Sequence, residues 1–204
     1  MNGTRVEVEE LDTAHGPARI HLRRPADDVR GLMVLGPGAS GSIRAADLEL
    51  AVRIAGESGL VAALVEPPYV VAGRRVPPRG SAPDESFVTV VEHLSARFPG
   101  ALITGGRSYG SRVACRTAAV LVPTGVLCLA FPEHPPGKPE RSRQPELDPV
   151  TVPVLVVQGA SDPFGCPSET ASARVLVVPG DHSLKKGLPE AADAIRNWLT
   201  ARLG

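Results

Sequence analysis

The distribution of apolar and polar positions along the chain predicts buried strands that alternate with amphipathic helices. Short continuous apolar runs are typical of strands covered on both faces of a parallel sheet. They occupy residues 31–35, 60–65, 101–106, 125–131, 152–158 and 174–178. Residues 6–11 and 19–23 instead alternate apolar and polar side chains, which predicts an antiparallel hairpin with one face in water.

Segments with helical apolar spacing separate several of these runs. They cover residues 43–57, 84–98, 109–122 and 189–203. Gly59 and the pair Pro99-Gly100 are expected to end the first two helices, and Asp84 to cap the second. The alternation indicates βαβ units and an α/β fold with a mainly parallel sheet of about eight strands. We expect residues 1–204 to form a single domain.

Composition and charge exclude several classes of protein. Hydrophobic residues make up 43% of the chain but aromatic residues only 3%, so we expect a core of small side chains. Lys+Arg and Asp+Glu both number 22, which gives none of the basic excess of a nucleic-acid-binding protein. An apolar run of about 18 residues, the length of a membrane span, is missing from the sequence.

The N-terminus and the cysteines suggest a cellular location. Residues 1–7 have acidic character where a signal peptide would begin its apolar region. The cysteines Cys115, Cys128 and Cys166 fit no zinc spacing, and their odd number argues against a disulfide framework. We therefore expect a reduced, cytoplasmic protein with small buried thiols and with neither nucleic acid nor a membrane as partner. A homodimer remains open.

The candidate chemistry centres on the sequence Gly-Arg-Ser-Tyr-Gly at residues 106–110, between an apolar run and a helix. This pattern is the sequence form of a nucleophile elbow, in which glycines allow a strained turn around the central serine. Ser108 would project from the edge of the sheet. The Tyr109 N–H, at the start of the helix, would face a developing oxyanion.

Two further residues follow later strands in the order expected for a serine hydrolase. Asp162 comes after the seventh predicted strand and His182 after the eighth. The order Ser…Asp…His is that of the α/β-hydrolases, and catalytic groups of parallel sheets lie at the carboxyl ends of strands. His182 would accept the serine proton, and Asp162 would orient His182.

Other assignments are open for each role. Ser108, Asp162 and His182 could each be an ordinary turn or loop residue, although three matches in this order favour catalysis. Asp181 adjoins His182, but neighbouring side chains in a loop usually diverge. Glu133 and His134 follow the sixth predicted strand and could serve as an alternate acid or a substrate contact. The remaining histidines, His15, His21 and His93, are predicted to be structural.

A second oxyanion donor is expected from the Gly-rich loop at residues 36–41. We choose the backbone N–H of Ala39 as this donor. A phosphate-binding loop is the competing interpretation. However, neither nucleotide fingerprint is present, and Pro37 lacks a backbone donor.

The chain resembles the α/β-hydrolases, specifically the small dienelactone-hydrolase-like group. That group also contains testis-expressed hydrolase-like proteins and a subunit of the non-specific-lethal chromatin complex. The matching stretches are residues 105–112, 134–140, 157–165 and 180–184, of which His-Pro-Pro-Gly-Lys-Pro is the most specific to the group. The usual His-Gly of the oxyanion loop is replaced by Pro37-Gly38.

The resemblance implies an α/β-hydrolase fold and a serine hydrolase of the carboxylesterase type that needs no cofactor or metal. Its substrate would be a small acyl compound with an ester, thioester or lactone bond. The alternatives are a non-catalytic interaction module and an acyltransferase that uses the same triad. Residues 132–151 are too few for a cap domain, so we expect an open cleft bordered by loops 66–83 and 132–142. Five basic residues could favour an acidic substrate or simply be solvated: Arg74, Arg75, Arg79, Arg107 and Lys138.

Overall fold

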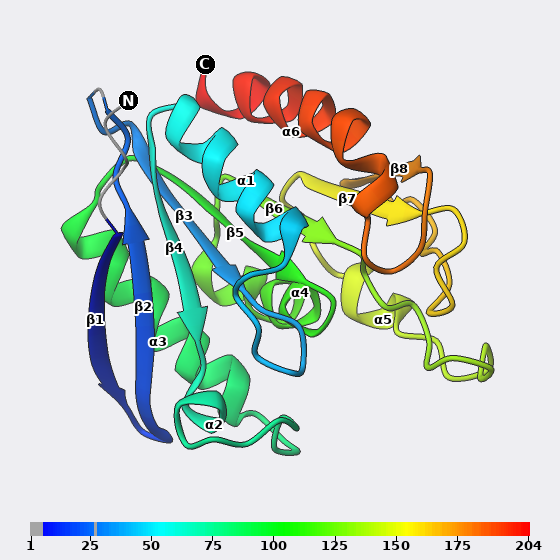
Figure 1. The fold of residues 1–204 in the computed structure, drawn as a ribbon, viewed down its shortest axis with the longest axis horizontal. Coiled ribbons are helices and arrows are strands. Elements are labelled where there is room, and N and C mark those ends of the chain that lie inside the picture. Colours follow the sequence, from blue (N-terminus) through cyan, green and yellow to red (C-terminus); the bar gives the residue numbers. More distant parts are fainter. Residues whose placement is uncertain (1–5, 27) are drawn as a thin grey trace.

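The computed structural model describes residues 6–26 and 28–204, which form an eight-stranded sheet with helices on both faces (Figure 1). The strands are Val6–Thr13 (β1), Gly16–Arg23 (β2), Gly31–Gly36 (β3), Leu60–Glu66 (β4), Ala101–Arg107 (β5), Gly125–Leu129 (β6), Val154–Gly159 (β7) and Ala173–Val178 (β8). The helices are Ala46–Glu57 (α1), Pro68–Val71 (α2), Ala82–Arg97 (α3), Tyr109–Leu121 (α4), Gln144–Leu147 (α5) and Leu188–Leu203 (α6), with a 3-10 turn at Lys185–Gly187 (η1). The predicted mainly parallel sheet is confirmed.

The strand order places a switch in direction at the centre of the sheet. The order is β1-β2-β4-β3-β5-β6-β7-β8, with β3 to β8 mutually parallel and the β1–β2 hairpin antiparallel at one edge. The chain therefore runs outward from β3 to β4, returns to β5, and then continues in the opposite direction. Ligands of such sheets bind outside the carboxyl ends of the strands at this switch point, which here lies between β3 and β5.

The two faces of the sheet are covered by different helices. Successive side chains of a strand point to opposite faces. Accordingly, Leu32 and Val34 pack with α3, whereas Met33 and Leu35 pack with α1 and α6. Helix α4, which follows Ser108, packs on the same face as α3 (Figure 1).

Some element boundaries differ from the sequence prediction. Helix α3 begins at Ala82, because a proline at Pro83 is compatible with the first turn of a helix. Asp84 therefore lies inside the helix rather than capping it, and pairs with Arg116 at 2.6 Å. Strand β6 ends at Leu129 because Ala130 has a φ of 50°.

One of the two segments predicted as loops contains a short helix. Helix α2 lies within residues 66–83, where Pro67 and Pro68 begin it. Helix α5 follows the other predicted loop, residues 132–142, and lies within the Pro-rich residues 132–151. In the part of the chain that the structure describes, we find no helix long and apolar enough to cross a membrane.

The cysteines are only partly as expected. Cys115 and Cys128 are buried, with their sulfur atoms 3.6 Å apart. Cys166 is exposed, so the prediction of buried thiols is wrong for this residue. It follows the turn after β7 rather than lying within a strand or helix, which leaves its side chain outside the core.

Candidate active site

Ser108 occupies a strained turn between β5 and α4. Its φ is 52° and its ψ is −112°, a conformation that side-chain-bearing residues rarely adopt. The Ser108 N–H donates to the Leu129 carbonyl at 2.8 Å, which ties the turn to the next strand. A Cβ at Gly106 would stand 2.5 Å from the Gly36 carbonyl oxygen, and one at Gly110 would clash with the same atom. The glycines thus let β3 approach the turn closely.

Three side chains from separate turns form a continuous hydrogen-bonded chain. His182 Nε2 lies 2.9 Å from Ser108 Oγ, and His182 Nδ1 lies 2.7 Å from Asp162 Oδ2. Because an ionised carboxylate only accepts, Nδ1–H donates to Asp162 and Nε2 is free to accept the serine proton. Asp181, the rival acid, instead accepts from the Ser183 N–H at 2.9 Å.

Asp162 is fixed by partners besides the histidine. Its side chain is fully buried, and its Oδ1 accepts the Phe164 N–H at 2.8 Å. The buried Gln158 amide donates to Asp162 Oδ2 at 2.8 Å and to the Gly165 carbonyl at 2.7 Å. The Phe164 ring lies 4.3 Å from the His182 ring, centroid to centroid. Gln158 was not identified from the sequence, although a polar residue at the end of an apolar run is a usable signal.

Arg107 connects the elbow to the histidine turn. Its guanidinium donates to the His182 carbonyl at 2.8 Å, and its Nε lies 3.0 Å from Asp47 Oδ2 in α1. That second contact is an ion pair without the alignment of a hydrogen bond. Burial raises the pKa of the Asp47 carboxyl, and the Arg107 guanidinium opposes this rise. Arg107 is therefore held by partners within the protein and is not a solvated surface charge.

The Gly-rich loop, which carries one of the two expected oxyanion donors, comes close to Ser108 at Gly38. A Cβ at Gly38 would be 3.7 Å from Ser108 Cβ, so the loop lies against the serine at this residue. The Tyr69 hydroxyl of α2 donates to the Ala39 carbonyl at 3.0 Å and anchors this segment, for which the sequence lacks the family's histidine. Within residues 6–26 and 28–204, neither the Ala39 N–H nor the Tyr109 N–H donates to a backbone carbonyl. Tyr69 was not identified from the sequence.

The other candidates lie outside the hydrogen-bonded chain. Glu133 accepts from Ser142, and the His134 N–H donates to the Phe164 carbonyl at 2.9 Å, beside the Asp162 turn.

The remaining histidines, His15, His21 and His93, face glutamates at or near the β1–β2 hairpin, as expected of structural residues. Four of the basic residues are exposed: Arg74, Arg75, Arg79 and Lys138. No cluster of His, Cys, Asp and Glu suited to a metal ion occurs among the described residues.

Comparison with known proteins identifies the family. A family model described as an alpha/beta hydrolase domain matches residues 30–199, which is most of the chain. The chain belongs to the α/β-hydrolase family. No curated protein matches the sequence. The resemblance seen in the sequence is therefore confirmed at the level of the family, while the smaller group within it stays a prediction.

Solved structures share this fold without close sequence identity. XC6422 from Xanthomonas campestris, described as an a/b serine hydrolase without lid, has a TM-score of 0.78 at 21% identity, covering 98% of this chain and 95% of its own. Est1E from Butyrivibrio proteoclasticus, solved with ferulic acid bound, has a TM-score of 0.79 at 15% identity, covering 96% and 99%. A serine hydrolase homologue from Coxiella burnetii has a TM-score of 0.75 at 16% identity, covering 95% and 97%. The α/β-hydrolase core is thus the shared architecture.

Proposed function

We propose that the protein is a carboxylesterase-like serine hydrolase that cleaves an ester-type bond of a small acyl substrate. Ser108 is the nucleophile, His182 the general base and acid, and Asp162 the residue that orients His182. The Tyr109 and Ala39 amides bind the oxyanion. The observation that carries the proposal is the continuous Ser108–His182–Asp162 hydrogen-bonded chain at the switch point of the sheet.

The reaction proceeds in two steps, the formation of an acyl-enzyme and its hydrolysis. Ser108 Oγ attacks the carbonyl carbon while its proton passes to His182 Nε2. The tetrahedral intermediate collapses, the bond to the leaving alcohol breaks, and His182 gives that alcohol the proton. Water then attacks the acyl carbon and loses a proton to His182. The bond to Oγ breaks, the carboxylic acid leaves, and His182 returns the proton to Ser108.

The surroundings of the site support this division of roles. Buried partners hold Asp162, so its carboxylate can stabilise the imidazolium formed during attack. The start of α4 adds the favourable end of a helix dipole at the Tyr109 amide. The His-Pro-Pro-Gly-Lys-Pro stretch supports placement in the dienelactone-hydrolase-like group, which forms part of the same proposal.

A fluorophosphonate probe tests the nucleophile directly. We expect covalent labelling of the wild-type protein and loss of labelling in Ser108→Ala. The buried Ser111, whose hydroxyl donates to the Ser108 carbonyl at 2.6 Å, should stay unlabelled in peptide mapping. Absence of labelling would support a non-catalytic interaction module, and labelling that survives Ser108→Ala would overturn Ser108 as the nucleophile. Product analysis with added alcohols or amines separates hydrolysis from acyl transfer.

A further inference from the structure

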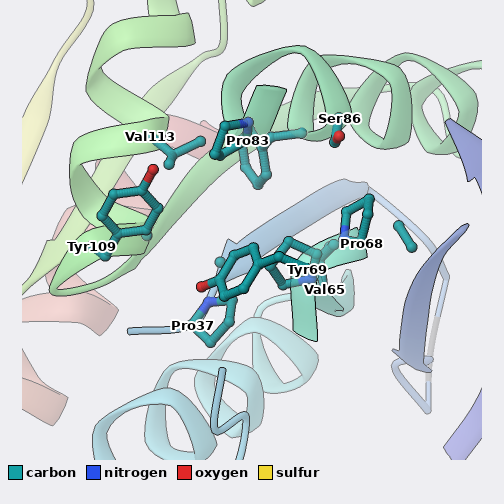
Figure 2. A pocket seen from close by; sticks show the side chains of 13 residues that line it. Pro37, Val65, Pro68, Tyr69, Pro83, Ser86, Tyr109 and Val113 are labelled. Carbon is teal, nitrogen blue, oxygen red and sulfur yellow. The ribbon is translucent and has the colours of Figure 1, made fainter. Parts of the chain in front are cut away.

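An apolar cavity lies between α3, α4 and the Gly-rich loop at residues 36–41 (Figure 2). Its volume is about 30 Å³. Six of the side chains that line it define its shape: Pro37, Val65, Tyr69, Phe87, Tyr109 and Val113. In Figure 2, Pro83 and Val113 lie on one side of the cavity, and Pro37 and Tyr69 on the other.

The wall of the cavity begins next to the proposed nucleophile. Tyr109 follows Ser108 in the chain and contributes the proposed oxyanion amide, while its ring lines the cavity. Pro37 precedes Gly38, at which a Cβ would be 3.7 Å from Ser108 Cβ. Two lining residues, Pro37 and Tyr109, are therefore the sequence neighbours of Gly38 and Ser108, which lie close together.

The chemistry of the walls favours an uncharged, apolar occupant. Burial raises the pKa of the Tyr69 phenol and that of the Tyr109 phenol, so both stay neutral at physiological pH. The Tyr69 hydroxyl already donates to Ala39. Arg112 and Arg116 lie over the Tyr109 ring, but Glu146 and Asp84 neutralise them. A carboxylate in the cavity would lose its hydration without gaining a free cation.

The size of the cavity limits the length of the occupant. A water molecule needs about 10–15 Å³ on this measure, so about 30 Å³ holds two to three water-sized groups. Methyl and methylene groups are close to water in size. We propose that the cavity binds the acyl chain of the substrate, a straight apolar chain of two or three carbons beyond the carbonyl. The inference rests on the proposed function and names its substrate class as propionyl or butyryl compounds.

A series of p-nitrophenyl methyl alkylphosphonates tests the serine and the cavity in one experiment. Phosphonylation forms a bond from Ser108 Oγ to phosphorus and releases nitrophenol, and the alkyl group stands where the acyl chain would be. We expect the rate to rise about fourfold for each carbon while the cavity fills. Beyond three alkyl carbons it should fall by about tenfold or more. The kcat/KM of p-nitrophenyl acetate, propionate, butyrate, hexanoate and octanoate should follow the same order.

Two variants of Val113 should change the preferred length of the acyl chain in opposite directions. Val113→Ala removes two methyl carbons from the wall, so the preferred acyl chain should lengthen by about two carbons. Val113→Ile adds one methylene and should shorten it by about one. Val120→Ala makes the same valine-to-alanine change on α4 at a position that is 67% exposed, and should keep the wild-type profile. If a variant fails to fold, the dependence of the wild-type rate on chain length alone tests the assignment of the cavity.

The outcomes separate this inference from the proposed function. Phosphonylation of Ser108 with no dependence on chain length, or with a preference for octyl chains, would overturn the assignment of the cavity and leave the serine hydrolase intact. Absence of phosphonylation, or phosphonylation that survives Ser108→Ala, would overturn the proposed function itself. A short-chain optimum that both Val113 variants shift as stated supports both.

Discussion

The two sides of Ser108 are held in place by different kinds of contact. On the histidine side, Asp162, Gln158 and Arg107 join the turns after β5, β7 and β8 through hydrogen bonds and an ion pair. On the cavity side, apolar packing forms the walls, and the Tyr69 hydroxyl links α2 to residues 36–41. Polar contacts thus hold the groups that we propose to transfer protons, whereas apolar packing shapes the cavity that we propose for the acyl chain.

The largest effect is expected from a comparison of two aspartates, Asp162 and Asp181. Asp162→Asn should lower kcat by about 10⁴-fold, because an amide no longer selects the histidine tautomer or stabilises its cation. Asp181→Asn provides the matched control. Its exposed carboxylate contacts Ser183 rather than His182, so activity should stay within about twofold.

Steady-state kinetics on one short-chain ester suffices for the measurement, with circular dichroism to verify folding. Comparable losses in both variants would mean that the carboxylates of Asp162 and Asp181 both support His182. A loss confined to Asp181→Asn would exchange their roles.

A smaller effect is expected at Arg107, which donates a hydrogen bond to the His182 carbonyl. Arg107→Met removes the donor to the His182 carbonyl and leaves the Asp47 carboxylate buried without its cation. The free energy of unfolding should fall by roughly 3–5 kcal/mol, because a buried charge without a partner destabilises the folded state. A misplaced imidazole should lower kcat by roughly 10–100-fold.

A double variant separates the two effects. Arg107→Met combined with Asp47→Asn removes the unpaired charge, so the urea midpoint should recover much of its loss while kcat stays low. Arg196→Met, which breaks an exposed pair with Glu57, is the control and should leave both quantities near wild type. Full recovery of kcat in the double variant would show that Arg107 does not position His182.

The sequence carried most of the fold because its signals are local. Apolar runs, Gly59 and the elbow glycines report strands, a helix end and a tight turn without knowledge of the rest of the chain. The order of Ser108, Asp162 and His182 predicted where the candidate site lies, because the carboxyl ends of parallel strands meet at one edge of the sheet. Charge and composition said little about the substrate.

The supporting contacts could not be predicted because they join residues far apart in the chain. Tyr69 meets Ala39, and Arg107 meets both Asp47 and His182, only after the sheet has assembled. Helix α2 lies in a Pro/Arg-rich segment without a helical apolar pattern. The cavity likewise exists only where α3, α4 and the ends of the strands come together.

The smallest effect that still distinguishes the two sides comes from the Tyr69 hydroxyl. Tyr69→Phe removes its hydrogen bond to the Ala39 carbonyl but keeps the ring against the cavity. Loss of one such bond should lower kcat/KM by roughly five- to tenfold. The preferred acyl length should not change, whereas Tyr69→Leu, which also reshapes the wall, should alter it. A change of chain-length preference in Tyr69→Phe would mean that the hydroxyl contacts the acyl chain itself, and the division between polar anchoring and apolar shape would fail on this side.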